Sequence, residues 1–168
     1  DGMWVYQPFH ILGFFSSFPS EILKEVNVFA GGYTSQYGGR LSSVIDITSR
    51  NGDKRKYAGT GSIAPFVSGF SLEGPVVDDV LSFLVSYRTS VIKQGASHLV
   101  KDDLPFEFDD LFAKLHAFVN SNSQISLSLL RTNEKGSVFE GNEFQPEQII
   151  QWKNRSASVR YFVFPRAF

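Results

Sequence analysis

Residues 26–50 read VNVFAGGYTSQYGGRLSSVIDITSR, and this stretch decides how the rest of the chain is interpreted. Apolar residues alternate with other types over 26–30, and a second apolar run begins at Val44. A period of two is typical of a β-strand, because successive side chains point to opposite faces. The glycines between the two runs permit backbone conformations that other residues avoid. The stretch therefore predicts a strand, a tight turn and a second strand, with the turn ending in Tyr37-Gly38-Gly39-Arg40.

The remainder of the chain is dominated by the same alternation. Further strands are predicted at 57–66, 69–74, 80–90, 110–119, 124–132 and 156–164. Each has one apolar face and one mainly polar face; Leu127, for example, lies between Ser126 and Ser128. Two environments fit this pattern. Either the apolar faces pack together in the core of a β-sandwich, or they face lipid outside a transmembrane barrel whose polar faces line the lumen.

The lengths of the connections favour the barrel. The predicted strands are joined by short links at 76–79 and 120–123, and by long links at 91–109 and 133–155. Transmembrane barrels alternate short periplasmic turns with longer external loops in this way. Strands of about ten residues also suit a tilted crossing of a bilayer.

Several segments resemble TonB-dependent outer-membrane receptors, in particular their Bacteroidetes-type branch. Residues 26–50 resemble the end of the plug domain, and PFHILGFFS at 8–16 resembles the stretch before it. Leu72-Glu73-Gly74-Pro75 and SFLVSYR at 82–88 resemble the first barrel hairpins. The resemblance covers most of the chain and is strongest up to about residue 90.

The resemblance implies a mainly β fold with a specific division of the chain. Residues 1–52 are expected to form the C-terminal part of a small α+β plug domain. Residues 53–168 are expected to form the first strands, about six, of an antiparallel transmembrane β-barrel, with the join at the polar stretch 51–55. Because Asp1 is not an initiator and the chain starts inside what resembles plug sequence, we expect a fragment of a longer receptor.

The function implied by the resemblance is energy-coupled uptake of a scarce nutrient across the outer membrane. Glycans, peptides, siderophores and cobalamin are all carried by receptors of this kind, so the substrate stays open. The implied partners are TonB, through a region N-terminal to this chain, a surface lipoprotein, the lipid of the outer membrane and the nutrient itself. The alternative from another class is a soluble extracellular β-sandwich that binds carbohydrate or protein.

Composition and motifs argue against several other classes of function. The 168 residues carry a net charge of −1, which gives no electrostatic basis for binding nucleic acid. No cysteine is present, so disulfides and thiolate metal sites are excluded. No Gly-x-Ser-x-Gly nucleophile motif occurs, and we predict neither an enzyme nor a cofactor. His10, His98 and His116 are too widely spaced to indicate a metal site, and the acidic stretch 102–110 is interpreted as a solvated loop rather than a calcium site.

The candidate site residues concern the plug and the external loops. Arg40 is predicted to pair with Glu73 across the contact between plug and barrel, because a guanidinium and a carboxylate form bidentate hydrogen bonds. Tyr37, Gly38 and Gly39 are predicted to form the plug turn or to let the backbone approach the barrel wall closely.

Three aromatic residues lie in or beside the predicted 133–155 loop. Aromatic side chains at such positions stack on a sugar or another flat ligand, pack the loop, or sit at a membrane interface. The residues proposed to face a ligand are Phe139, Phe144 and Trp152.

Overall fold

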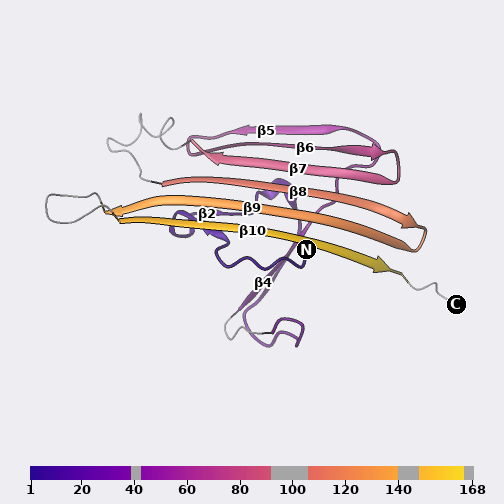
Figure 1. Ribbon diagram of the computed structural model, residues 1–168, viewed down its shortest axis with the longest axis horizontal. Helices are drawn as coiled ribbons and strands as arrows, with labels where there is room; N and C mark the ends of the chain where they lie inside the picture. The colour runs from indigo at the N-terminus through magenta and orange to yellow at the C-terminus, as the bar shows by residue number, and fades with distance from the viewer. Residues whose placement is uncertain (39–42, 92–105, 140–147, 165–168) are drawn as a thin grey trace.

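The computed structural model describes residues 1–38, 43–91, 106–139 and 148–164, and within these ranges the protein is almost entirely β (Figure 1). The strands form one six-stranded and two two-stranded sheets, all with antiparallel pairing. Helical structure in the described ranges is limited to short 3-10 turns at Ile11–Gly13 and Ser20–Ile22. Among the described residues, no helix combines the length and the apolar character needed to cross a membrane.

The large sheet is an open meander in which each strand pairs with the next along the chain. Its order is β5-β6-β7-β8-β9-β10, so β5 and β10 are its edges. The six predicted strands are confirmed in number and order. Their bounds are β5 (Ala58–Ile63), β6 (Val67–Val77), β7 (Leu81–Ser90), β8 (Phe106–Asn120), β9 (Ser123–Phe139) and β10 (Gln148–Val163).

The last three strands are longer than the sequence predicts. Strand β9 reaches Phe139 and β10 begins at Gln148, so the long loop predicted at 133–155 is wrong over most of its length. The alternation becomes polar there, but strand pairing continues, and oppositely charged residues face each other at one β8–β9 position. Glu107 on β8 is in register with Lys135 on β9.

Residues 1–52, which we call the N-terminal segment, carry the two small sheets. Strands β1 (Phe9–His10) and β2 (Phe15–Ser16) form one pair, and β3 (Leu23–Phe29) and β4 (Val44–Ser49) form the other. The predicted strand–turn–strand around the glycine-rich stretch is therefore confirmed as an antiparallel pair. The segment packs against one face of the large sheet, and in Figure 1 part of it lies behind the sheet while β4 extends below β10.

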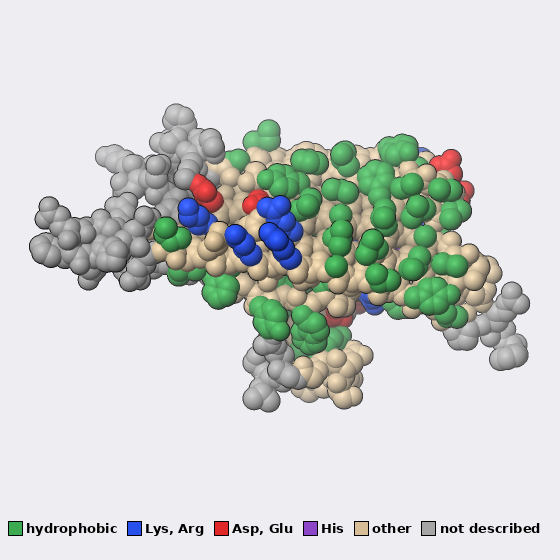
Figure 2. All heavy atoms as spheres, viewed as in Figure 1, with side chains coloured by type: hydrophobic (Ala, Val, Ile, Leu, Met, Phe, Trp, Pro, Cys, Tyr) green, Lys and Arg blue, Asp and Glu red, His purple; other side chains and the backbone are tan. Residues whose placement is uncertain are grey.

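In the large sheet the polar face is buried and the apolar face is exposed, the reverse of the arrangement usual in a soluble protein. The face covered by the N-terminal segment, the buried face, is mainly polar: Ser82, Ser86, Asp110, Lys114, His116, Ser126, Ser128, Thr132 and Glu134 are all buried. The other face, the exposed face, is a broad apolar surface (Figure 2) that includes Phe70, Leu72, Leu111, Leu115, Ile125, Leu127, Leu129, Val159 and Tyr161. Apolar side chains gather outside and charged ones inside, the reverse of the usual preference.

The apolar contact between the segment and the sheet is small. Ile22 packs with Leu84, Phe112 and Leu130 on the buried face, and Met3, Val5, Phe18 and Leu23 lie against this cluster. Polar side chains surround it, so the docking of the N-terminal segment depends largely on hydrogen bonds and ion pairs.

Candidate functional site: the polar interface beneath the N-terminal segment

The first contact of this interface is a buried histidine held between two carboxylates. His10, at the end of β1, is only 2% exposed. Its Nε2 lies 2.7 Å from Asp110 Oδ1 on β8, and its Nδ1 lies 3.4 Å from Glu134 Oε2 on β9. The imidazole also stacks on Phe108, with ring centroids 4.3 Å apart and planes 7° from parallel. Both ring nitrogens of His10 therefore face carboxylate oxygens, which can accept hydrogen bonds from an imidazole N–H.

The backbone next to His10 is fixed by the carboxylate of Glu134. Ile11 N donates to Glu134 Oε1 at 2.6 Å. Ile11 has φ +49°, a left-handed conformation that a β-branched residue rarely adopts. The hydrogen bond to Glu134 offsets that strain and turns the chain sharply into Ile11–Gly13.

Arg88 on β7 links the carboxylate of Asp110 to the second short strand, β2. Its Nη2 and Nε donate to Asp110 Oδ2 at 2.6 and 3.2 Å, and Nη2 also donates to the carbonyl oxygen of Ser16 in β2. Asp110 is 2% exposed. One of its carboxylate oxygens accepts from Arg88, and the other faces His10. We call His10, Arg88, Asp110 and Glu134 the histidine cluster.

A second contact holds the end of β4 against β8. Lys114 Nζ donates to the carbonyl oxygen and to Oγ of Ser49 at 3.1 and 3.0 Å. The Asp1 carboxylate lies 3.4 Å from Lys114 Nζ and 3.7 Å from a guanidinium nitrogen of Arg160 on β10. This buried ammonium is thus matched by one carboxylate and two neutral acceptors.

The third contact joins the end of the N-terminal segment to the first hairpin of the sheet. Arg50 Nη1 donates to Glu73 Oε2 at 2.5 Å, and the backbone N–H of Asp53 donates to the same oxygen at 3.0 Å. Arg50 Nε also donates to the carbonyl oxygen of Glu21. Glu73 Oε2 thus accepts from Arg50 and Asp53. The predicted pairing of Glu73 with Arg40 stays a prediction, because Arg40 lies outside the described residues.

Gly52 lies at this third contact and is buried. A Cβ at this position would sit 1.9 Å from the carbonyl oxygen of Phe83 on β7. The close approach of segment backbone to sheet backbone, which the sequence suggested for Gly38 and Gly39, occurs here. Gly38 is exposed, with no atom within 4 Å of a notional Cβ, and Gly39 lies outside the described residues.

The remaining predicted site residues have separate locations. The hydroxyl of Tyr37 donates to Asp46 Oδ2 on β4 at 2.9 Å, and this bond raises the pKa of Tyr37 above its usual value of 10. Trp152 lies within β10 rather than in a loop, in register with Glu134, and its side chain is 51% exposed. Phe139 ends β9 but its side chain lies outside the description, as do Phe144 and His98.

The histidine cluster escaped prediction because its members are far apart in sequence. His10 is separated from Asp110 by 100 positions and from Glu134 by 124. The available signal was their alternation, which places Arg88, Asp110 and Glu134 on the polar faces of neighbouring strands. Within the described part of the chain, no group of three or more His, Cys, Asp or Glu side chains is arranged to hold a metal ion.

Glu73→Gln tests the third contact. The variant keeps the size of the side chain but removes the charge that accepts from Arg50 and Asp53, and hydrogen bonds to a charged group contribute about 1.5–3 kcal/mol. Because Arg50 is 30% exposed, we expect a loss near the lower end of that range, measured by denaturant unfolding. Glu25→Gln on exposed β3 is the matched control and should change little. Equal stability of both variants would contradict a role for Glu73 in docking.

Comparison with known proteins adds no assignment: no protein-family model, curated protein or solved structure matches the chain.

Proposed function

We propose that this chain is part of a TonB-dependent outer-membrane receptor. In this proposal residues 1–52 are the C-terminal part of the plug, and residues 53–168 are the first strands of the barrel. The observation that carries it is the reversed polarity of the large sheet, whose polar face is covered by residues 1–52 while its apolar face is bare. A barrel wall with lipid outside and a polar plug inside requires this distribution.

The height of the apolar surface fits a bilayer. On β7 it is marked by Leu81, Phe83, Val85 and Tyr87, which alternate along the exposed face. Six residue steps separate the first from the last, and a strand rises about 3.4 Å per residue, so the outer rows are about 20 Å apart. With the side chains of the end rows included, this approaches the roughly 25 Å apolar band of outer-membrane barrels.

The interface of the N-terminal segment suits a plug that must move. A large dry apolar contact would resist separation, whereas ion pairs and hydrogen bonds can be exchanged for bonds to water with a small net change. The segment here rests on three polar contacts around a small apolar cluster. Force delivered through TonB to such a segment could therefore open a path for a glycan, peptide, siderophore or cobalamin.

The soluble β-sandwich makes the opposite demand on the sheet. Its apolar face would be packed against a second sheet and its polar face would meet water. In this chain the buried face carries Asp110, Lys114 and Glu134, while Leu127 on the opposite face is 38% exposed. The polarity of the sheet therefore favours the receptor over the sandwich.

Leu127→Arg tests the proposal. Leu127 lies in the middle of the apolar surface, where a charge facing lipid costs about 2–4 kcal/mol. We expect the parent chain to fold as a β-rich, protease-resistant species only with detergent micelles or bilayers, and Leu127→Arg to lose that insertion. Val28→Arg, at a 67% exposed position on β3, should insert normally.

The same experiment separates the two candidate functions. A soluble sandwich would form a compact monomer without detergent. That outcome would refute the receptor proposal, and so would insertion of Leu127→Arg into micelles as efficient as that of Val28→Arg.

A further inference from the structure

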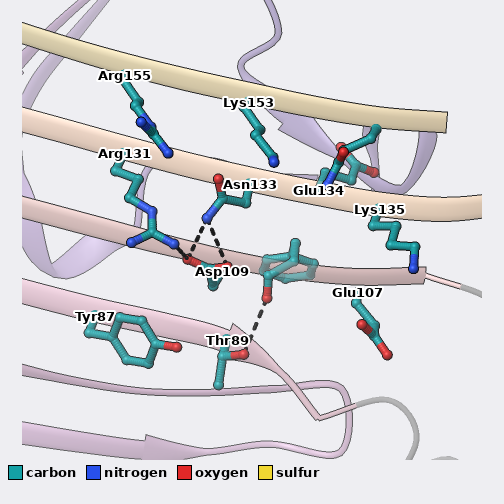
Figure 3. A pocket seen from close by; sticks show the side chains of 12 residues that line it. Tyr87, Thr89, Glu107, Asp109, Arg131, Asn133, Glu134, Lys135, Lys153 and Arg155 are labelled. Atoms are coloured by element: carbon teal, nitrogen blue, oxygen red, sulfur yellow. Dashed lines mark hydrogen bonds and ion pairs between the residues drawn. The ribbon is translucent and has the colours of Figure 1, made fainter.

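A row of basic side chains borders the apolar part of the exposed face. Arg131 on β9 and Arg155 on β10 are directly paired in register. Two residues further along the strands, on the same face, Lys153 is paired with Asn133. All three basic residues are exposed, and their side chains project on the same side of the strands (Figure 3). They border a depression of about 360 Å³. Figure 2 shows blue side chains gathered beside the apolar surface. We call Arg131, Lys153 and Arg155 the basic row.

Among the described residues, the basic row carries more positive charge than its ion pairs neutralise. Asp109 on β8 lies 3.6 Å from Arg131 and accepts from Asn133 Nδ2 at 3.0 and 2.9 Å. Within the described ranges, Lys153 and Arg155 have no carboxylate within 4.0 Å. Like charges directly opposite on antiparallel strands repel each other, so the Arg131–Arg155 pair is destabilising unless an anion lies between the two side chains.

The change from charged to apolar is abrupt. The next row of the exposed face pairs Leu129 with Ala157, and the row after it pairs Leu127 with Val159. Successive rows are about 7 Å apart along the strand. A ligand bound here therefore meets cations at one end and apolar side chains over the rest of its length, which is the pattern of an amphipathic anion.

We propose that the basic row binds the phosphate of an anionic membrane lipid whose acyl chains lie along the neighbouring apolar surface. The inference rests on the proposed function, because it takes the exposed face to be the face that meets the bilayer. Arg131 and Arg155 supply planar guanidinium groups that match phosphate oxygens in bidentate fashion, and Lys153 adds a flexible ammonium. The row lies where the apolar rows of β9 and β10 end, which places the bound headgroup at the edge of the apolar surface.

A lipid is favoured over a free phosphate or a protein partner by the continuity of the two surfaces. A free anion would use the basic row alone and leave the apolar rows bare. An acidic protein would need a flat polar surround, whereas the side chains beyond Arg131 and Arg155 are Leu129 and Ala157. Charge and apolar area are both satisfied by one phosphorylated lipid.

The test compares a triple variant, Arg131→Gln, Lys153→Gln and Arg155→Gln, with a control that loses the same charge. The control carries Lys24→Gln, Arg55→Gln and Lys56→Gln, three exposed positions away from the basic row. The chain in detergent is titrated with vesicles of phosphatidylcholine alone, with vesicles that also contain a lipid bearing phosphate monoesters, and with inorganic phosphate. The measured quantity is the ratio of affinities for phosphorylated and neutral vesicles.

We expect the parent chain and the control to prefer the phosphorylated vesicles, with a preference that weakens as salt is added. Each basic side chain near a charged membrane surface contributes about fivefold, so the triple variant should lose on the order of a hundredfold of the preference. Its affinity for neutral vesicles should stay unchanged.

Three outcomes would overturn the inference: no preference in the parent chain, an equal loss in the control, or competition by inorganic phosphate as strong as that by the lipid. Failure of the proposed function is a different result, since the parent chain would then bind no vesicle at all.

Discussion

Asp110→Asn is expected to detach the hairpin of β1 and β2 from the large sheet. The substitution preserves the shape of the side chain but removes the charge that Arg88 and His10 both face, at 2.6 and 2.7 Å. His10 is 2% exposed, and neither it nor Arg88 can recover a full water shell while the hairpin stays docked. Removing one partner of a buried pair typically costs about 3–5 kcal/mol, because the other charge is left uncompensated.

Hydrogen exchange locates this loss. The N–H of Ile11 donates to Glu134, and the N–H of Ser17 donates to the carbonyl oxygen of Pro8 at 2.8 Å, so both amides report on the docked hairpin. We expect both to lose protection in Asp110→Asn, together with a lower unfolding midpoint in denaturant.

Asp79→Asn is the matched control, since it breaks the Arg55–Asp79 ion pair with the same chemistry at a largely exposed site. Such pairs contribute about 0–1 kcal/mol. Unchanged protection of Ile11 and Ser17 in Asp110→Asn would show that the histidine cluster does not hold the hairpin.

Features that depend on neighbouring residues could be predicted from the sequence, whereas contacts between residues far apart in the chain are shown only by the structure. Alternation along a strand is local, because the pleat itself sends neighbouring side chains to opposite faces. The six strands and their order could therefore be predicted. The interpretation of the acidic stretch 102–110 as a solvated loop is wrong from Phe106 onward, because Asp109 and Asp110 lie on β8 and Asp110 is buried. Which face would be covered depends on where the N-terminal segment docks, and no local pattern contains that information.

The partner of Glu73 illustrates the same limit. Arg40 and Arg50 flank β4 on either side, and both have the chemistry to bind a carboxylate. Arg50 directly follows the strand and precedes the link to β5, so the chain carries it to the first hairpin of the sheet. The path of the backbone, which the type of side chain does not reveal, brings Arg50 to Glu73.

The end of β9 was predicted too early for a different reason. Hydrophobic alternation fades after Thr132, although β9 continues to Phe139 because it pairs with β8 as far as Gly136 and with β10 as far as Phe139. A rule based on apolar periodicity detects only the part of a strand that faces an apolar environment. In the proposed receptor, the missed part is the part that extends beyond the lipid.

Gly52→Ala is expected to separate the end of the N-terminal segment from β7. The new Cβ would lie 1.9 Å from the carbonyl oxygen and 2.5 Å from the carbonyl carbon of Phe83. Both are backbone atoms in the interior of the sheet, so the segment must move instead. Overpacking of this kind costs about 1–3 kcal/mol, and more where the neighbour cannot yield. We expect about 3 kcal/mol or more, because the movement also disturbs the adjacent Arg50–Glu73 and Ser49–Lys114 contacts.

Gly61→Ala controls for the chemical change alone. Gly61 lies on edge strand β5 with no atom within 4 Å of a notional Cβ, so alanine should be neutral or stabilise the strand by up to about 1 kcal/mol. Denaturant unfolding and the rate of proteolysis within residues 1–52 measure both variants. A Gly52→Ala chain as stable as the parent would mean that the backbones of segment and sheet are not in contact at this point.

Combining Gly52→Ala with Asp110→Asn tests whether the N-terminal segment docks as one unit. The two sites lie at different contacts, and independent contacts would give additive losses of stability. If instead one substitution already releases the whole segment, the second removes contacts that no longer exist, and the double variant loses clearly less than the sum. We expect the smaller loss, because Ile22, Leu84 and Phe112 join the two contacts through a single apolar cluster. Strict additivity would mean that the hairpin and the β3–β4 pair detach separately, and a plug built in this way would open in two steps rather than one.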